Sequence, residues 1–417
     1  NLQEMMAKAR AAQKVIEFWD QEKVDEMVLA AGWEGYKKET AEEVARLAVD
    51  ETGLGVYQDK LLKHQKKTLG VLRDLKEAKT VGVIERNEAK GLVKIAKPVG
   101  VIGAITPMTN ASSTMTCNGL PILKTRNAVI FCPHPKAKKT CASICEHMRD
   151  GLRKVGAPVD LIQYIEEPTM ELSQQLMSIV DLVLATGGAG VVKVAYSSGK
   201  PAYGVGAGNV TMIVDETADI DDAAKKIFLG KTFDNATSCS SENNVIIHES
   251  VFEKTLAGLK SHGGYLVTGE DRAKLKATMW PDGTHLNGKI VAKSVKVLAG
   301  EAGITVPEGT TFLMVMGEKI GPEDMFSAEK LSLVLTLWKY ADFSKAVQMV
   351  VDITAFSGYG HSCGIHSTND EHILELATKA KVSRMMVRQP QCYGNSGDWV
   401  NGMPFGLTLG CGTWGGN

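Results

Sequence analysis

The sequence has no long apolar run and no dominant charge. Nowhere do about 18 apolar residues follow one another, and no basic and apolar leader opens the chain, so we expect no membrane span. Its 47 Lys and Arg residues nearly balance 48 Asp and Glu residues, which leaves a net charge of −1. That balance gives no reason to expect a nucleic acid or a membrane surface as a partner.

Cysteine is also scarce. The eight cysteines are too scattered for a disulfide scaffold, and no Cys-x-x-Cys pair occurs, so we expect a cytoplasmic protein. Cys141 and Cys145 are spaced four apart on a predicted helix, where they could serve a metal or be two buried thiols. Because no second pair of ligands accompanies them, we predict buried thiols and no metal site.

The pattern of apolar runs predicts an α/β fold in two domains. The 417 residues are too many for one typical domain. Apolar positions at helical spacing predict two or three helices within 2–50, and two β-rich runs around a polar turn predict a hairpin within 80–99. Beyond residue 100, strands alternate with helices, which predicts parallel sheets built from βαβ units and a boundary near residue 210. The first series of apolar runs is 101–106, 128–132, 161–165 and 181–185, with helices at 136–154 and 168–179; the second is 210–214, 245–248, 289–298 and 331–340.

Cys239 is the candidate nucleophile. It lies in Thr237-Ser238-Cys239-Ser240-Ser241, where small hydroxyl residues leave the thiol sterically open just before an apolar strand. Two polar turns, 106–110 and the glycine-rich run 186–209, follow predicted strands, and cofactors bind at the carboxyl ends of such strands. Glycine lets the backbone approach a phosphate closely, although the run after Thr186 is not a Gly-x-Gly-x-x-Gly fingerprint and either turn could be an ordinary one. The combination favours a dehydrogenase with a cysteine nucleophile.

These motifs resemble a known family. The spacing of Asn110, Thr186-Gly187-Gly188, the run 204–209, Cys239 and 329–332 is similar to that of the aldehyde dehydrogenase superfamily. The segments 195–201 and 409–417 are shared more narrowly with its CoA-acylating branch. The resemblance implies a Rossmann-type NAD(P)-binding domain over 1–210, with an oligomerisation hairpin at 80–99, and an α/β catalytic domain over 211–405. It also implies a return to the cofactor domain at 406–417, a family segment beyond residue 417, and a homodimer or homotetramer.

The resemblance also implies roles for single residues. Cys239 would attack the aldehyde, with Asn110 and the backbone N–H of Cys239 stabilising the oxyanion, and Glu329 would steady the nicotinamide ribose, although Leu333 stands where the family has proline. No acidic residue follows the strand 128–132, and Lys136 and Lys138 allow NADP in preference to NAD, unless they are simply solvent-facing. The expected cofactor-binding residues are Thr106, Pro107, His134, Pro135, Lys136, Thr186, Gly187, Gly188, Val191, Gly206 and Glu329.

The acyl acceptor follows from a missing carboxylate. Hydrolytic members have a glutamate base in a Glu-Leu-Gly-Gly-Lys run, and this chain has Gly204-Val205-Gly206-Ala207-Gly208 there. Without a base to activate water, coenzyme A, a thiol that needs little activation, is the expected acceptor. The alternatives are a flexible turn without mechanistic meaning, and a related reductase that uses phosphate in place of CoA.

Polar residues near the motifs indicate an anionic aldehyde. Thr109, Ser238, Ser240, His361 and Arg388 are the candidates for binding substrate or CoA, because hydroxyls and a guanidinium suit an anionic head group. His361 could equally be structural, and Arg388 could equally hold a CoA phosphate or form a surface ion pair. The flanking residues most resemble enzymes for sulfoacetaldehyde, with succinate semialdehyde and acetaldehyde as alternatives. A member whose main role is scaffolding is a different class of function, and the retained Cys239, Asn110 and Glu329 argue against a degenerate enzyme.

Overall fold

The structure is a computed structural model that describes residues 1–408 and 414. The C-terminal glycine-rich motif therefore lies, apart from Trp414, outside the described residues. The chain forms two compact units. The first contains Asn1–Gly53, Tyr57–Val205 and the segment that starts at Ser396, and the second contains Leu54–Val56 and Gly206–Asn395. Among the described residues, no helix is both long enough and apolar enough to cross a membrane.

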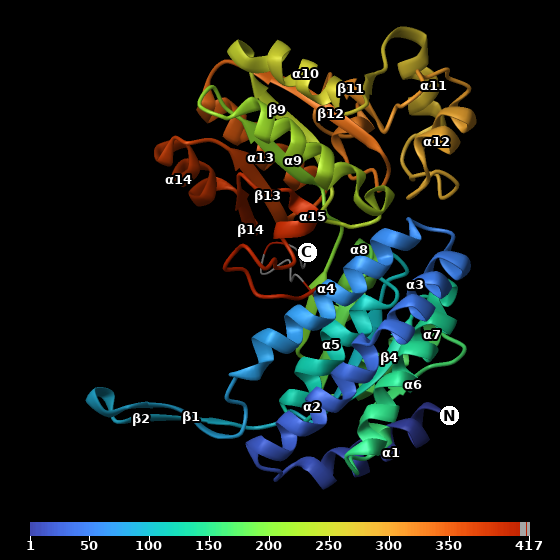
Figure 1. Ribbon diagram of the computed structural model, residues 1–417, viewed down its shortest axis with the longest axis vertical. Coiled ribbons are helices and arrows are strands. Elements are labelled where there is room, and N and C mark those ends of the chain that lie inside the picture. The colour runs from blue at the N-terminus through green and yellow to red at the C-terminus, as the bar shows by residue number, and fades with distance from the viewer. Residues whose placement is uncertain (409–413, 415–417) are drawn as a thin grey trace. The chain divides into compact units, whose positions relative to one another are not determined.

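The first unit contains a parallel five-stranded sheet, which confirms the predicted α/β class (Figure 1). The strand order is β5-β4-β3-β6-β7, so the chain continues on one side of β3 and later returns to the other. The central strands β3 and β4 are Val-, Ile- and Ala-rich and buried along their whole length, as strands covered on both faces must be. The strands are β3 (Val101–Thr106), β4 (Ala128–Pro133), β5 (Ile162–Tyr164), β6 (Leu182–Thr186) and β7 (Ala202–Val205).

Eight α-helices belong to this unit within the described residues. Three of them cover the predicted helical region 2–50 and agree with its apolar spacing. Their order along the chain is α1 (Leu2–Ile16), α2 (Gln21–Tyr36), α3 (Lys38–Thr52), α4 (Tyr57–Lys76), α5 (Ser113–Lys124), α6 (Lys138–Lys154), α7 (Met170–Ile179) and α8 (Ala189–Tyr196). Cys141 and Cys145 are buried on α6 with their sulfur atoms 4.0 Å apart.

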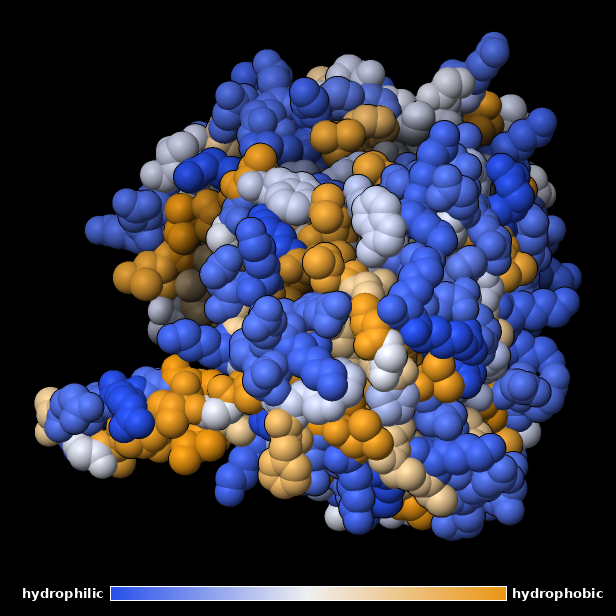
Figure 2. Space-filling model, turned by 60° about the horizontal axis from the view of Figure 1, so that its bottom comes forward, coloured by the Kyte–Doolittle hydropathy of each residue, from blue (hydrophilic) through white to orange (hydrophobic). Residues whose placement is uncertain are grey.

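The predicted hairpin is formed by β1 (Gly82–Asn87) and β2 (Leu92–Ala96), which pair antiparallel. It projects from the first unit at the lower left of Figure 1. Its apolar side chains are unusually exposed: Figure 2 shows orange residues along this arm, and Leu92 and Ile95 are 57% and 58% exposed. A contiguous exposed apolar surface of this kind is uncommon on monomeric proteins.

The chain returns to the first unit after residue 395. The Lys67 ammonium on α4 donates to the carbonyl oxygens of Ser396 and Gly397, at 3.3 and 2.6 Å. Phe405 and Leu407 then join the buried apolar core of this unit. Gly70 on α4 allows this packing, because a Cβ atom there would lie 2.2 Å from the Phe405 ring.

The second unit contains a parallel seven-stranded sheet in the order β10-β11-β12-β9-β8-β13-β14. Its strands are β8 (Val210–Val214), β9 (Glu242–His248), β10 (Gly264–Leu266), β11 (Phe312–Met316), β12 (Val334–Tyr340), β13 (Gly360–His366) and β14 (Val382–Val387). Its helices are α9 (Ile220–Thr232), α10 (Phe252–Ser261), α11 (Gly269–Met279), α12 (Val295–Ala302), α13 (Phe343–Phe356), α14 (Asp370–Lys379) and α15 (Gln391–Gly394).

One member of the second predicted series is wrong. Residues 289–298 are not a strand: turns lead into α12, which begins at Val295 behind an N-cap in which the Ser294 side chain accepts the Val297 N–H at 3.4 Å. Val295, Leu298 and Ala299 are buried at helical spacing. Over so short a stretch, alternating apolar residues and a helical face are hard to tell apart from sequence.

Two buried charged residues connect α9 to β9. Lys231 at the end of α9 donates to the Glu242 carbonyl at 2.8 Å, and the Glu242 carboxyl accepts the Gln391 N–H at 2.8 Å. Burial lowers the pKa of Lys231 to about 8 and raises the pKa of Glu242 to about 8. The second carboxyl oxygen of Glu242 is buried without a hydrogen-bond partner among the described residues. Glu242 is therefore best accommodated in its neutral, protonated form at neutral pH.

This leads to a test of stability against pH. The pKa of Glu242 is raised from 4.5 to about 8 by folding, so between these values the unfolded chain has released a proton that the folded chain retains. Folding stability supplied by this group therefore falls as pH rises through that window. Glu242→Gln, which mimics the protonated form, should gain stability relative to wild type by up to about 1.4 kcal/mol per pH unit.

The measurement is urea unfolding of both proteins at several pH values between 5 and 8. Glu253→Gln on α10 is the control, because the Glu253 side chain is 80% exposed and its substitution should leave the pH dependence unchanged. If the free energy of unfolding differs between Glu242→Gln and wild type by the same amount at every pH, Glu242 is not neutral in the folded protein.

Candidate functional site

Cys239 lies in a turn directly before β9, as the sequence predicted. The preceding segment is unusual, because Asp234, Asn235 and Ala236 all adopt left-handed backbone conformations, with φ of 53°, 51° and 57°. Such φ values cost non-glycine residues energy, least so for Asp and Asn. The turn is held by the Thr237 N–H, which donates to the Asp234 carbonyl at 3.0 Å, and by the Val56 N–H, which donates to the Asp234 carboxylate at 2.9 Å.

A buried imidazole lies beside the thiol. His361, at the start of β13, places Nε2 3.3 Å from Cys239 Sγ, and its Nδ1 lies 2.7 Å from Ser362 Oγ. Burial, with a smaller effect from the positive charge of Arg384, lowers the pKa of His361 to about 4. The imidazole is therefore neutral near neutral pH, and a neutral ring can exchange a proton with the thiol. The structure brings these two predicted residues together.

The backbone of Gly208 approaches Cys239 closely. A Cβ atom at this position would lie 1.9 Å from the Cys239 carbonyl oxygen and 3.0 Å from the His361 ring, so only glycine fits. Its N–H donates to the Glu329 carboxyl at 2.9 Å, and its carbonyl accepts from the Asn243 amide at 3.3 Å. Burial raises the pKa of Glu329 to about 7, while the Gly208 N–H acts in the opposite direction.

The remaining predicted residues of the second unit separate into two groups. Ser238 and Ser240 lie with Cys239, and their hydroxyl oxygens are 3.1 Å apart. Arg388 does not: it follows β14 and donates to the Ser367 carbonyl at 2.6 Å, just beyond the carboxyl end of β13. Ser367 is six positions beyond His361, which at about 3.3 Å per residue places the two about 20 Å apart. The prediction that Arg388 binds the aldehyde is therefore wrong, because its guanidinium is held at Ser367, far from His361.

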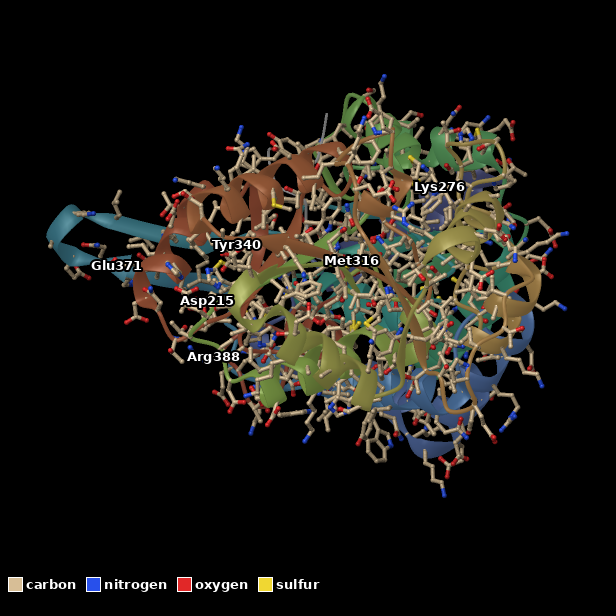
Figure 3. All side chains as sticks on the ribbon, turned by 90° about the horizontal axis from the view of Figure 1, so that it is seen from above. Asp215, Lys276, Met316, Tyr340, Glu371 and Arg388 are labelled. Atoms are coloured by element: carbon tan, nitrogen blue, oxygen red, sulfur yellow. The ribbon has the colours of Figure 1, made fainter. Side chains whose placement is uncertain are left out.

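Asp215 organises the region around Arg388, and both are labelled at the left of Figure 3 with Tyr340. Asp215, Glu216 and His372 lie close enough to share a metal ion. However, Asp215 already accepts hydrogen bonds from Thr217 at 2.7 Å and His372 at 2.8 Å, and from the Ser367 hydroxyl. These hydrogen bonds indicate that the Asp215 carboxylate has a structural role and holds the surrounding loops in place.

In the first unit, two predicted loops meet at the switch point of the sheet. Neighbouring strands β3 and β6 end at Thr106 and Thr186, and β3 is where the strand order reverses. Open α/β sheets bind their ligands at this position. Gly187 packs against Val191, and Gly188 caps α8 with open space where a Cβ would stand. Thr106 Oγ1 is buried without a hydrogen-bond partner among the described residues, so this place suits a polar ligand such as a dinucleotide.

The segment after β4 was expected to lack an acidic residue, but Glu51 of α3 lies beside it. The His134 ring accepts the Lys136 N–H at 3.1 Å, so His134 caps the single turn that starts at Pro135, and Lys136 is exposed. Lys138 is paired with Glu167 at 2.5 Å. A carboxylate is nevertheless present: Glu51 of α3 accepts the N–H groups of Lys139 and Thr140, each at 2.8 Å. The preference for NADP over NAD stays a prediction.

Asn110 has a defined side-chain orientation. It lies in the turn before α5, with Pro107 and Thr109, and its Oδ1 accepts from the buried Lys63 ammonium at 3.0 Å. The neighbouring Thr109 carbonyl accepts from Lys60 at 3.2 Å. Because Oδ1 is bound by Lys63, the two hydrogens on Nδ2 are the donors that this amide can offer to a ligand.

Several important residues were not found from sequence. Lys63, Glu51 and Arg384 each come from an element far along the chain from the residue they contact or influence. Lys63 and Glu51 lie within helices that contain several other charged residues, so nothing local distinguishes them. The sequence drew attention to the run 204–208 as a whole, and the close approach of Gly208 to Cys239 is a tertiary feature that the sequence did not reveal.

Comparisons with known proteins agree with this arrangement. The model of the aldehyde dehydrogenase family matches residues 1–406. The sulfoacetaldehyde dehydrogenase (acylating) of Bilophila wadsworthia is 51% identical over 418 residues, which cover 99% of this chain and 90% of that protein. An acetylating aldehyde dehydrogenase from Geobacillus thermoglucosidasius has a crystal structure that matches with a TM-score of 0.94 at 38% identity, over 99% of this chain and 90% of that chain.

A third relative has a ligand in its crystal structure. The propionaldehyde dehydrogenase of Rhodopseudomonas palustris, with bound propionyl-CoA, matches with a TM-score of 0.89 at 27% identity, over 98% of this chain and 89% of that chain. These matches extend over almost the whole sequence and confirm the resemblance inferred from its motifs. The chain belongs to the aldehyde dehydrogenase family.

Proposed function

We propose that this protein is a CoA-acylating aldehyde dehydrogenase that converts a short anionic aldehyde, first of all sulfoacetaldehyde, into its acyl-CoA with reduction of NADP or NAD. The observation that supports this most directly is the position of Cys239, whose Sγ lies 3.3 Å from a neutral His361 and whose backbone carbonyl packs against Gly208. The 51% identity to a sulfoacetaldehyde dehydrogenase (acylating) supports the choice of substrate. Succinate semialdehyde and acetaldehyde remain the alternatives.

Cys239 is the group that forms the covalent intermediate. Its sulfur, as thiolate, adds to the aldehyde carbon and gives a thiohemiacetal oxyanion. We assign the stabilisation of that oxyanion to the Cys239 N–H and the Asn110 amide, whose oriented Nδ2 donor is suited to the role; such a donor typically contributes ~3 kcal/mol. A bound nicotinamide would supply the hydride acceptor for oxidation at the thiohemiacetal carbon. The product on the enzyme is then a thioester of Cys239.

The first unit supplies residues that suit the nicotinamide cofactor. Thr106, Pro107, Thr186, Gly187 and Gly188 lie at the switch point, where open space and a helix N-terminus fit a pyrophosphate. His134, Pro135, Lys136 and Val191 border the same edge of the sheet, at the ends of β4 and β6. In the second unit, Gly206 begins the glycine segment, and we assign Glu329, held by the Gly208 N–H, to the ribose.

Coenzyme A is the proposed acceptor of the acyl group. Its thiol loses a proton, attacks the thioester carbon and expels Cys239 as thiolate, which regenerates the enzyme. Neutral His361 can take the proton, because Nε2 lies within reach of the sulfur. The glycine segment 204–208 contributes no carboxylate that could activate water in its place. Acyl phosphate as the product, with inorganic phosphate in place of CoA, would identify the related phosphate-dependent reductase instead.

The hairpin suggests an oligomer. Exposed apolar side chains on β1 and β2, together with Val99 at 55% exposure, form a surface suited to a second copy of this chain. We propose a homodimer or homotetramer in which this hairpin contributes to the interface. A cytoplasmic location likewise stays a prediction.

Removal of the nucleophile should abolish the reaction. We expect Cys239→Ala to reduce nicotinamide at a rate at least about 1,000-fold below wild type in the presence of sulfoacetaldehyde and CoA, because no covalent intermediate can form. The absorbance of the reduced nicotinamide measures this rate. Cys145→Ala, which changes a buried thiol on α6, is the control and should retain activity. Comparable activity of the Cys239→Ala protein would rule out the proposed mechanism.

Deletion of the hairpin should lower the oligomeric state. Gly82 and Ala96 are register partners, so a short Gly-Ser linker can replace the intervening residues without straining the remaining chain. Size-exclusion chromatography with light scattering should then show a smaller assembly than the wild type. Lys94→Ser, which removes one exposed ion pair of the hairpin, should leave the mass unchanged. A deletion variant with the wild-type mass would exclude the hairpin from the interface.

A further inference from the structure

The backbone of Arg384 lies one strand away from Ser362, the neighbour of His361, whereas Arg388 lies beyond the other end of β14. Arg384 is part of β14, the edge strand of the seven-stranded sheet, and its Cα is paired with that of Ser362 in β13. Paired residues on neighbouring parallel strands, about 4.8 Å apart, point to the same face of the sheet. Ser362 is in turn bonded to His361, and His361 lies 3.3 Å from Cys239 Sγ.

The guanidinium of Arg384 is only partly satisfied. Its Nη1 donates to the Asn395 carbonyl, a neutral partner. A guanidinium has five N–H donors, so several remain for another acceptor. No Asp or Glu of the described residues forms an ion pair with it, and burial lowers the pKa of Arg384 with no carboxylate to offset that effect.

The charge of Arg384 acts on the catalytic residues. It contributes, less than burial does, to the lowered pKa of His361, in keeping with the register that places Arg384 beside Ser362. A cation that is largely removed from water without a carboxylate partner is costly for a protein to maintain. The cost is offset if an anion binds beside it during function.

We propose that Arg384 binds the anionic head group of the aldehyde substrate and thereby selects sulfonate- or carboxylate-bearing aldehydes over neutral ones. This inference rests on the proposed function, and it names the residue that determines specificity. The planar guanidinium can hold two oxygens of a sulfonate or carboxylate at once. Hydroxyl groups of Ser238 and Ser240 lie beside Cys239 and are available for the remaining oxygens.

The experiment compares two aldehydes with each variant. We expect Arg384→Gln to lower kcat/KM for sulfoacetaldehyde by about 10- to 100-fold, the range of a lost hydrogen bond to a charged group. The kcat/KM for acetaldehyde should change by less than about threefold, because acetaldehyde has no head group for the arginine to bind. Measurements at pH 8, with saturating CoA and nicotinamide, keep His361 neutral in all proteins.

Two further variants make the outcome decisive. Arg384→Lys keeps a positive charge without the fork geometry and should recover part of the loss for sulfoacetaldehyde, which a merely structural role would not predict. Lys381→Gln removes an exposed charge just before β14 and should leave both substrates unaffected.

Three results would overturn the inference: equal losses for both aldehydes, a selective loss with Arg388→Gln in place of Arg384→Gln, or a raised KM for CoA with every aldehyde. The last of these would identify a CoA phosphate as the ligand. If the wild-type protein reduces nicotinamide with none of the aldehydes in the presence of CoA, the proposed function itself fails. Active wild type with an unselective Arg384→Gln variant refutes the role of Arg384 alone.

Discussion

The catalytic unit depends on the absence of a side chain at residue 208. The backbone of Gly208 approaches the Cys239 carbonyl so closely that a Cβ would stand 1.9 Å from the oxygen. A Cβ there would also lie 3.0 Å from the His361 ring, and the Gly208 N–H donates to Glu329. Nucleophile, imidazole and buried carboxyl are thus arranged around one glycine, and any larger residue would displace the loop that contains Cys239. Gly208 ends the same glycine segment whose first residue, Gly204, stands where hydrolytic members have the catalytic glutamate.

Charge in this unit is arranged to keep the groups around the sulfur neutral. Burial raises the pKa of Glu329 and lowers that of His361, so that near neutral pH the imidazole is uncharged and the carboxyl is partly protonated. Burial also lowers the pKa of Lys231 and raises the pKa of Glu242. A neutral imidazole and a partly protonated carboxyl in this site suit a thioester that must persist until a thiol arrives.

The sequence was most informative where chemistry is local. The motifs around Cys239, Asn110, Thr186 and Glu329 predicted the family, and period-two and period-3.6 patterns predicted most elements. It failed at 289–298, where a short apolar stretch fitted both a strand and the helix α12. The sequence analysis also selected Arg388 and passed over Arg384. Arg384 lies in β14 and Arg388 directly follows it, and only the register of Arg384 with Ser362 shows which end of the sheet each arginine occupies.

Leaving out coenzyme A is the most direct test of its role as the acceptor of the acyl group on Cys239. Wild-type protein is mixed with aldehyde and oxidised nicotinamide, and the reduced nicotinamide formed per chain is followed through the first turnovers. We predict a burst of about one equivalent per Cys239, then arrest with the acyl group on that cysteine in the mass spectrum, and resumption when CoA is added. Sustained turnover without CoA, with free acid as the product, would contradict the account; its loss in Glu329→Gln would then identify that carboxyl as the base that activates water.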